Sequence, residues 1–122
     1  MPTHIFAPTR IDVPGNKQLD EYIGQVNTGA RDISVAHMVS PPGWSEPGQT
    51  PRFREITVVL HGTLRVEHAA GVMEIKACQA VIAEPGEWVR YSTPEGANYI
   101  SVCTPAFTPE TVHRDETGLA GC

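Results

Sequence analysis

The sequence has few cationic side chains, and this shortage argues against several classes of function. Nine Lys and Arg residues stand against fourteen Asp and Glu residues, which gives a formal net charge of -5 over 122 residues. Nucleic acids and anionic membrane surfaces both attract clustered positive charge, so neither suits this chain as a main partner. No apolar run approaches the roughly 20 residues that cross a bilayer. We therefore expect no nucleic-acid partner and no membrane partner.

Cysteine is also scarce, and its three positions form no known motif. Cys78, Cys103 and Cys122 make no CxxC pair, which excludes a zinc knuckle and a thioredoxin motif. The N-terminus has no basic segment followed by an apolar one, so the sequence predicts no secretory signal. Free thiols without a signal are typical of a reducing compartment, and we expect a cytoplasmic location. The absence of GxSxG, P-loop, dinucleotide and HExxH motifs leaves serine hydrolysis, phosphoryl transfer and dinucleotide chemistry unsupported.

Glycine and proline are abundant, with eleven of each, and they divide the chain into short segments rich in β-branched residues. The length predicts one domain. Alternation and turn residues predict strands at 33–40, 55–60, 63–68, 72–76, 79–83, 87–92 and 98–103, with His61-Gly62 as a tight turn. Residues 1–32 are expected to form an arm with a short helix within 19–26, and residues 108–122 an irregular tail. The pattern predicts an antiparallel barrel or sandwich, and an immunoglobulin-like sandwich lacks its signature here.

The stretch from Gly43 to Gly62 resembles the first motif of the cupin family. Gly43, Glu55 and Gly62 fall on its spacing, while Gln49 and Pro51 occupy the two histidine positions. In the second motif only Gly86 matches. Residues 33–107 thus resemble a single-domain cupin, with some similarity to the ethanolamine-utilisation type. The resemblance implies an all-β, cupin-type double-stranded β-helix (jelly-roll barrel) and a homodimer.

The resemblance also bears on metal binding, because the family's ligands are three histidines and one glutamate. Their positions hold Gln49, Pro51, Glu55 and Val89, and two of these have no donor atom. One carboxylate and one amide make a poor site for transition metals. We expect no metal and no other cofactor. A rebuilt site that uses His37 or His113 is the alternative.

Glu55 is the first candidate for chemistry. It lies in phase with Thr57 and Val59, and the resemblance directs that face into the barrel. A carboxylate among apolar strand residues must be paired or have a raised pKa, and a raised pKa suits a general acid or base. The alternative is a structural ion pair with one of three arginines, Arg52, Arg54 or Arg90.

Two further residues are candidate catalytic partners of Glu55. His37 interrupts an apolar strand, and beside Glu55 it would form a proton-transfer pair. The alternative is a histidine of the core or the barrel mouth with its hydrogen bonds satisfied. Tyr91 shares the phase of Val89, and its hydroxyl would donate a hydrogen bond to a substrate oxygen. The alternative is an aromatic side chain that only packs. The candidate substrate-binding residues are Gln49, Trp44, Phe53, Thr57, Val89 and Arg90, the last expected to face inward only if a bulge re-aims it.

Together these residues predict a small-molecule-binding cupin, with metal-independent acid–base catalysis of the isomerase, lyase or cyclase type on a polar organic substrate. A non-catalytic binding or sensing module is the first alternative. A metal-dependent enzyme with a rebuilt site is the second.

Overall fold

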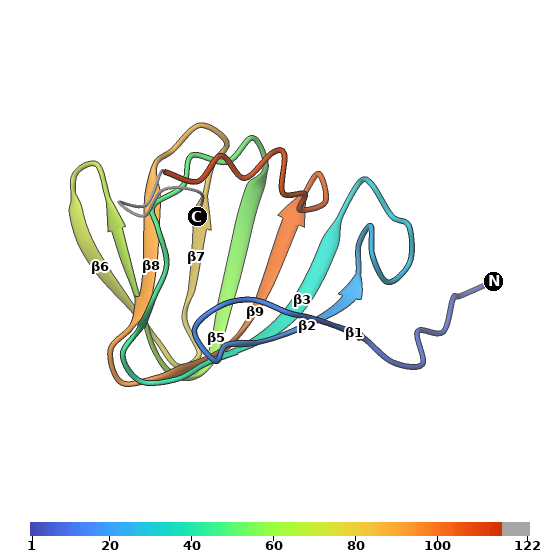
Figure 1. Ribbon diagram of the computed structural model, residues 1–122, viewed down its shortest axis with the longest axis horizontal. Coiled ribbons are helices and arrows are strands. Elements are labelled where there is room, and N and C mark those ends of the chain that lie inside the picture. The colour runs from blue at the N-terminus through green and yellow to red at the C-terminus, as the bar shows by residue number, and fades with distance from the viewer. Residues whose placement is uncertain (116–122) are drawn as a thin grey trace.

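The computed structural model describes residues 1–115, and each regular element in that range is a β-strand. Figure 1 shows them curled around one another. They are β1 (Thr9–Ile11), β2 (Gln18–Ile23), β3 (Ser34–Ser40), β4 (Trp44–Ser45), β5 (Arg54–His68), β6 (Gly71–Lys76), β7 (Ala80–Ala83), β8 (Val89–Thr93) and β9 (Ala97–Thr104). The all-β prediction is confirmed. Cys122 and the end of the predicted tail lie outside the described residues.

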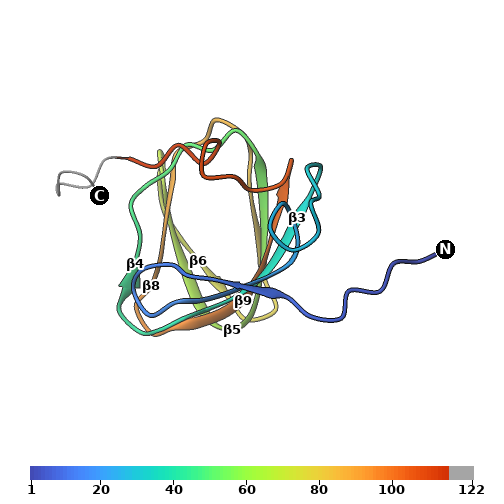
Figure 2. The same ribbon diagram turned by 45° about the vertical axis from the view of Figure 1, so that its right-hand side comes forward.

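The strands form two antiparallel sheets that share β5. One sheet has the order β1-β2-β3-β9-β5-β7, and the other has the order β6-β5-β8-β4. In Figure 2 the strands curl into a barrel, with β4 and β8 on one side and β3 on the other. Inward-facing side chains of both sheets therefore meet inside one curled structure, as expected for a jelly roll.

β5 is a single continuous strand, whereas the sequence predicted two strands separated by a turn at His61-Gly62. Its first part pairs with β9 as far as Gly62, and the rest pairs with β6 and β8. The register shifts between Val59 and His61, which marks a β-bulge, and Gly62 has a φ of +78°. A Cβ at Gly62 would lie 2.3 Å from the Gly96 carbonyl oxygen. The His-Gly pair bends the strand from one sheet into the other, because a bulge changes direction without ending the strand.

The N-terminal region contributes strands to the barrel, and the expected helix is wrong. Gln18–Ile23 forms β2, which pairs with β3, and β1 pairs with β2 at the edge of the same sheet. The loop between β1 and β2 reaches the opposite side, where a Cβ on Gly15 would lie 2.9 Å from the Trp44 ring. Residues before 33 therefore form part of the barrel wall.

Apolar side chains inside the barrel form two clusters. The larger contains Trp44, Val59, Leu64, Val66, Ile75, Ala83, Val89, Tyr91, Ala97 and Tyr99. The smaller contains Phe53, Cys103 and Val112, with Phe107 packed against it. Both clusters contribute side chains to the wall of one interior cavity. Within residues 1–115 there is no helix long and apolar enough to cross a membrane.

Candidate functional site

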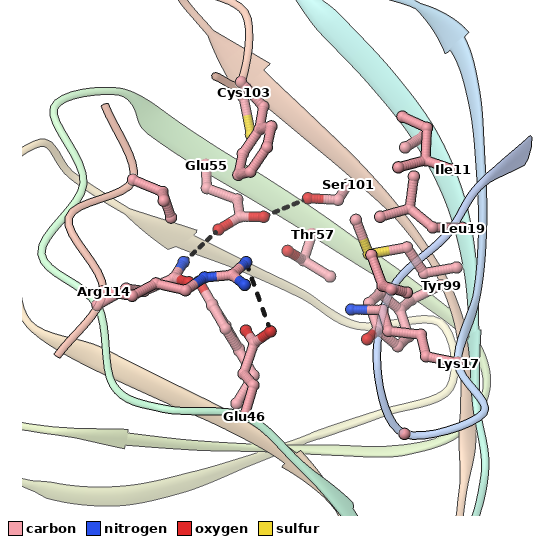
Figure 3. Close-up of a pocket in the computed structure, with 18 of the residues that line it drawn as sticks. Ile11, Lys17, Leu19, Glu46, Glu55, Thr57, Tyr99, Ser101, Cys103 and Arg114 are labelled. Atoms are coloured by element: carbon pink, nitrogen blue, oxygen red, sulfur yellow. Dashed lines mark hydrogen bonds and ion pairs between the residues drawn. The ribbon is translucent and has the colours of Figure 1, made fainter. Parts of the chain in front are cut away.

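A cavity of about 710 Å³ occupies the interior of the barrel. Its walls come from β2, β3, β5, β8 and β9, from the loop that joins β1 to β2, and from the C-terminal segment around Val112 and Arg114. Figure 3 shows polar side chains projecting into this space from several of these elements. Cavities of this size with apolar walls and a few convergent polar groups are typical small-molecule sites.

Glu55 projects from the start of β5 into the cavity. One carboxylate oxygen accepts a hydrogen bond from Gln49 Nε2 at 3.5 Å, and the other accepts one from Ser101 Oγ on β9. Two of the arginines considered as partners pair elsewhere, Arg54 with Glu84 at 2.6 Å and Arg90 with Glu67 at 3.4 Å. Among the described residues Glu55 forms no ion pair, so only neutral donors hold its carboxylate in place.

Two buried polar atoms beside Glu55 have no hydrogen-bond partner among the described residues. They are the hydroxyl of Tyr91, whose side chain projects from β8, and Oε1 of Gln49. The two residues are 5% and 3% exposed. Burial raises the pKa of Tyr91 far above its ordinary value of 10.0, and the Glu55 carboxylate raises it further. The hydroxyl therefore stays protonated at neutral pH and is available to donate. A buried polar group without a partner costs about 1–3 kcal/mol, so such groups are rare outside functional sites.

Lys17, Glu46 and Arg114 bring three more charged side chains to the cavity around Glu55 (Figure 3). The ammonium of Lys17, from the β1–β2 loop, is 4.2 Å from the centroid of the Trp44 ring and 5.6 Å from that of Tyr99. Arg114 Nη2 lies 3.7 Å from an oxygen of Glu46. Burial lowers the pKa of Lys17 below its ordinary value of 10.5. Burial likewise raises the pKa of Glu46 above 4.5, and Lys17 and Arg114 oppose that shift. The Glu46 side chain is 14% exposed and the Arg114 side chain 40%, so Glu46 is largely shielded from bulk water while Arg114 still reaches it.

Six of the predicted site residues meet in this cavity. Glu55, Gln49 and Tyr91 form its polar centre, and the remaining three line it: Trp44, Phe53 and Thr57. Phe53 also packs edge-on against Phe107, with 5.8 Å between ring centroids. The prediction of an inward face on β5 holds at Thr57 and Val59, which are both buried.

Three of the predicted site residues lie elsewhere. His37 faces out of the barrel, where its Nε2 lies 2.5 Å from Asn98 Oδ1, so the expected His37–Glu55 pair does not form. The cause is strand phase, because Ala36 and Met38 take the inward positions of β3. Val89 is buried in the core without lining the cavity. Arg90, next to it, faces solvent, and no bulge re-aims it.

Four polar cavity residues that matter for the site were not predicted from the sequence: Lys17, Glu46, Ser101 and Arg114. Lys17 and Arg114 belong to segments that the sequence analysis took for an arm and a tail, and only the three-dimensional fold brings them to the cavity. Ser101 alternates with buried neighbours along β9, so its inward phase was open to prediction from the strand pattern.

The donors at the family's metal positions do not fit a transition metal. Gln49 and Glu55 are present there, but Pro51 and Val89 offer no donor. Within residues 1–115 no three His, Cys, Asp or Glu side chains come close enough to share an ion. The rebuilt site is not formed either, because His37 faces outward and His113 is exposed. We derive no chemistry through a metal.

Comparison with known proteins gives one partial relative in sequence. No protein-family model matches the chain. A curated protein, endoribonuclease YbeY of Myxococcus xanthus (strain DK1622), is 40% identical over 101 residues. The match covers 81% of this chain but 34% of that protein. The chain therefore spans about a third of the length of this relative, whose name describes the whole protein.

Solved structures share the fold at low sequence identity. An RmlC-like cupin from Shewanella frigidimarina has a TM-score of 0.65 at 14% identity, covering 81% of this chain and 85% of that one. Ethanolamine utilization protein Q of Salmonella typhimurium has a TM-score of 0.61 at 22% identity, covering 75% and 71%. Oxalate decarboxylase of Bacillus subtilis has a TM-score of 0.76 at 13% identity, covering 93% and 33%. The chain therefore has the cupin fold, with a likeness to the ethanolamine-utilisation type that its sequence predicted.

Proposed function

We propose that this protein binds a small polar organic molecule inside the barrel and moves a proton on it with Glu55 and Tyr91. One observation carries the proposal. Tyr91 and Gln49 each bury a polar atom without a partner among the described residues, and both lie beside Glu55. A bound molecule with oxygen or nitrogen atoms would satisfy these groups, and it would offset the free energy that their burial costs.

The chemistry follows from what each group can donate or accept. Glu55 takes a proton from a carbon or hydroxyl of the substrate, while Gln49 Nε2 and Ser101 Oγ hold its carboxylate in place. The Tyr91 hydroxyl donates a hydrogen bond to the substrate oxygen on which negative charge develops. The same proton returns from Glu55 to a different atom of the intermediate, so atoms and charge balance without an oxidant. Isomerisation and cyclisation fit this scheme, and elimination fits it when the returning proton goes to the departing group.

A non-catalytic binding or sensing module is the second candidate, and the sequence relative favours it. The chain matches about a third of a longer protein whose name is that of an endoribonuclease. A cupin within such a protein would report a small molecule to the rest of the polypeptide. Direct RNA recognition by this chain is less favoured, because its net charge is -5 and its polar groups converge inside a barrel. A cytoplasmic location and a homodimer complete the proposal.

Two steps test the proposal. A thermal-shift screen of small keto acids, hydroxy acids, lactones and polyols finds compounds that bind, since binding to the folded state raises the melting temperature. Each compound is then incubated in D₂O, and proton exchange at its carbons is followed by NMR. We expect Glu55→Gln to lower the exchange rate at least 100-fold while binding persists.

The matched control is Glu84→Gln, which removes an exposed carboxylate that pairs with Arg54 outside the cavity. Its exchange rate should equal that of the unmodified protein. Exchange that survives in Glu55→Gln would overturn the acid–base role. Binding without any exchange would favour the sensing module. A screen in which no compound stabilises the protein would count against both.

A further inference from the structure

We propose that Lys17 recognises a carboxylate, so that the cavity selects small organic acids. This inference deepens the proposed function and rests on the same cavity. Lys17 lies on the β1–β2 loop, and its ammonium is directed into the cavity on the wall opposite Glu55 (Figure 3). It is placed to contact one end of a molecule whose other end lies at Glu55 and Tyr91.

Aromatic rings hold the Lys17 ammonium without neutralising it. The ammonium lies 4.2 Å from the centroid of Trp44 and 5.6 Å from that of Tyr99, both within the range of cation–π attraction. No carboxylate of the described residues comes within ion-pair distance of it. The rings fix the direction of the charge, and its hydrogen-bond donors stay available because a ring face accepts none of them strongly.

Among the described residues, Lys17 is the cavity cation without an ion-pair partner. Six charged residues line the cavity: Asp12, Lys17, Glu21, Glu46, Glu55 and Arg114. Asp12 is exposed, and the Glu21 carboxylate accepts hydrogen bonds from the backbone N–H groups of Val26 and Asn27. Arg114 and Glu46 form an ion pair at 3.7 Å, which uses one charge of each sign. Lys17 and Glu55 are left on opposite walls. A molecule with one negative group near Lys17 and a proton to exchange near Glu55 matches this arrangement.

A monocarboxylate suits the site better than a phosphate. A phosphate carries close to two negative charges and many acceptor atoms, and Glu46 and Glu55 would repel the second charge. One ammonium is also too few donors for three phosphate oxygens. A carboxylate brings a single charge, and the largely apolar walls accommodate the body of an organic acid. Burial lowers the pKa of Lys17, and an anion beside it would restore the charged form.

The test uses matched pairs of probes. Monocarboxylic acids of four to ten carbons, aliphatic and aromatic, are each compared with their own primary amide, which has the same shape and no charge. Dissociation constants come from thermal shifts at pH 6.5 and fixed ionic strength, where the free acids are charged. The proteins are the full chain, Lys17→Met and Lys76→Met. Lys76 is the second of the two lysines in the sequence, and it is exposed on β6.

Lys17→Met keeps an unbranched side chain that still packs on Trp44 and Tyr99. We expect acids to bind the full chain at least tenfold more tightly than their amides, and this preference to fall below about twofold in Lys17→Met. Lys76→Met should keep the preference. An acid preference that persists without Lys17, or acids and amides that bind the full chain equally, would overturn the inference and leave the proposed function intact. If neither acids nor amides bind while Glu55-dependent exchange is seen with other compounds, the inference again fails alone.

Discussion

The hydroxyl of Tyr91 offers a direct test of the reasoning, because the barrel contains a matched control. Tyr91 and Tyr99 are both buried, at 5% and 3% exposure. The Tyr99 hydroxyl lies 2.9 Å from Ser40 Oγ, while that of Tyr91 has no partner among the described residues. The same change, Tyr to Phe, removes a costly group at one position and a useful one at the other.

The magnitudes follow from the hydrogen bonds. A buried, unpartnered hydroxyl costs about 1–3 kcal/mol, so Tyr91→Phe should stabilise the free protein by about 1 kcal/mol or more. Tyr99→Phe leaves Ser40 without its partner and should destabilise by about 1 kcal/mol. Unfolding entropy of about 2.1 cal/mol/K per residue makes 1 kcal/mol worth about 4 °C in a chain of this length. The two variants should therefore differ by about 8 °C.

The assay is urea unfolding of the ligand-free protein and the two variants, followed by circular dichroism, with melting curves as a second measure. The slopes against urea should agree, since the variants expose the same surface on unfolding. If Tyr91→Phe destabilises as much as Tyr99→Phe, the Tyr91 hydroxyl already has a good partner in the free protein. The main observation behind the proposed ligand would then be lost.

Three further predictions concern the fold, its pH dependence and its assembly. Gly62→Ala should destabilise the fold by about 3 kcal/mol or more, because the added Cβ would lie 2.3 Å from the Gly96 carbonyl oxygen. Gly86→Ala should cost only about 1 kcal/mol, because φ there is +85° but no atom lies near the added Cβ. Similar urea midpoints for the two variants would contradict this. Burial raises the pKa of Cys103 above its ordinary 9.0. Only the unfolded chain then loses the thiol proton as the pH rises past 9, so the free energy of unfolding should fall with pH. The fall should be steeper than in Cys103→Ala by about 1 kcal/mol per pH unit. Urea-unfolding free energies of the two proteins that run parallel from pH 8 to 10.5 would refute this. Light scattering of the unmodified protein should give twice the monomer mass. The Ile82 side chain faces outward and is 57% exposed, and Ile82→Lys should give a folded monomer. An unmodified protein that is monomeric would rule out the homodimer.

The strand pattern predicted much of the barrel because turns and β-branched residues act locally. The predicted ends of five strands lie within about two residues of the observed ends. These strands are β3, β6, β7, β8 and β9. The bend at Gly62 was taken for a turn, because a His-Gly pair has the same local signature in a bulge. β2 was taken for a short helix, since its pairing with β3 is a long-range contact that its own residues do not reveal.

The site was predictable where strand phase determined it. Glu55 and Thr57 alternate along β5 as expected, and Tyr91 takes an inward position on β8. The phase of β3 was ambiguous because both faces carry apolar residues, and the prediction for His37 failed for that reason. Lys17 reaches the cavity only through the pairing of β1, β2 and β3, which no local pattern encodes.

The central claim is that the barrel cavity is a small-molecule site organised by Glu55, Gln49 and Tyr91. A crystal structure of the protein with the compound that stabilises it most tests this claim most directly. We predict that the compound lies inside the barrel, with polar atoms within about 3 Å of the Tyr91 hydroxyl and of Gln49 Oε1. A compound bound on the outer surface, with both atoms still lacking a partner, would contradict the account.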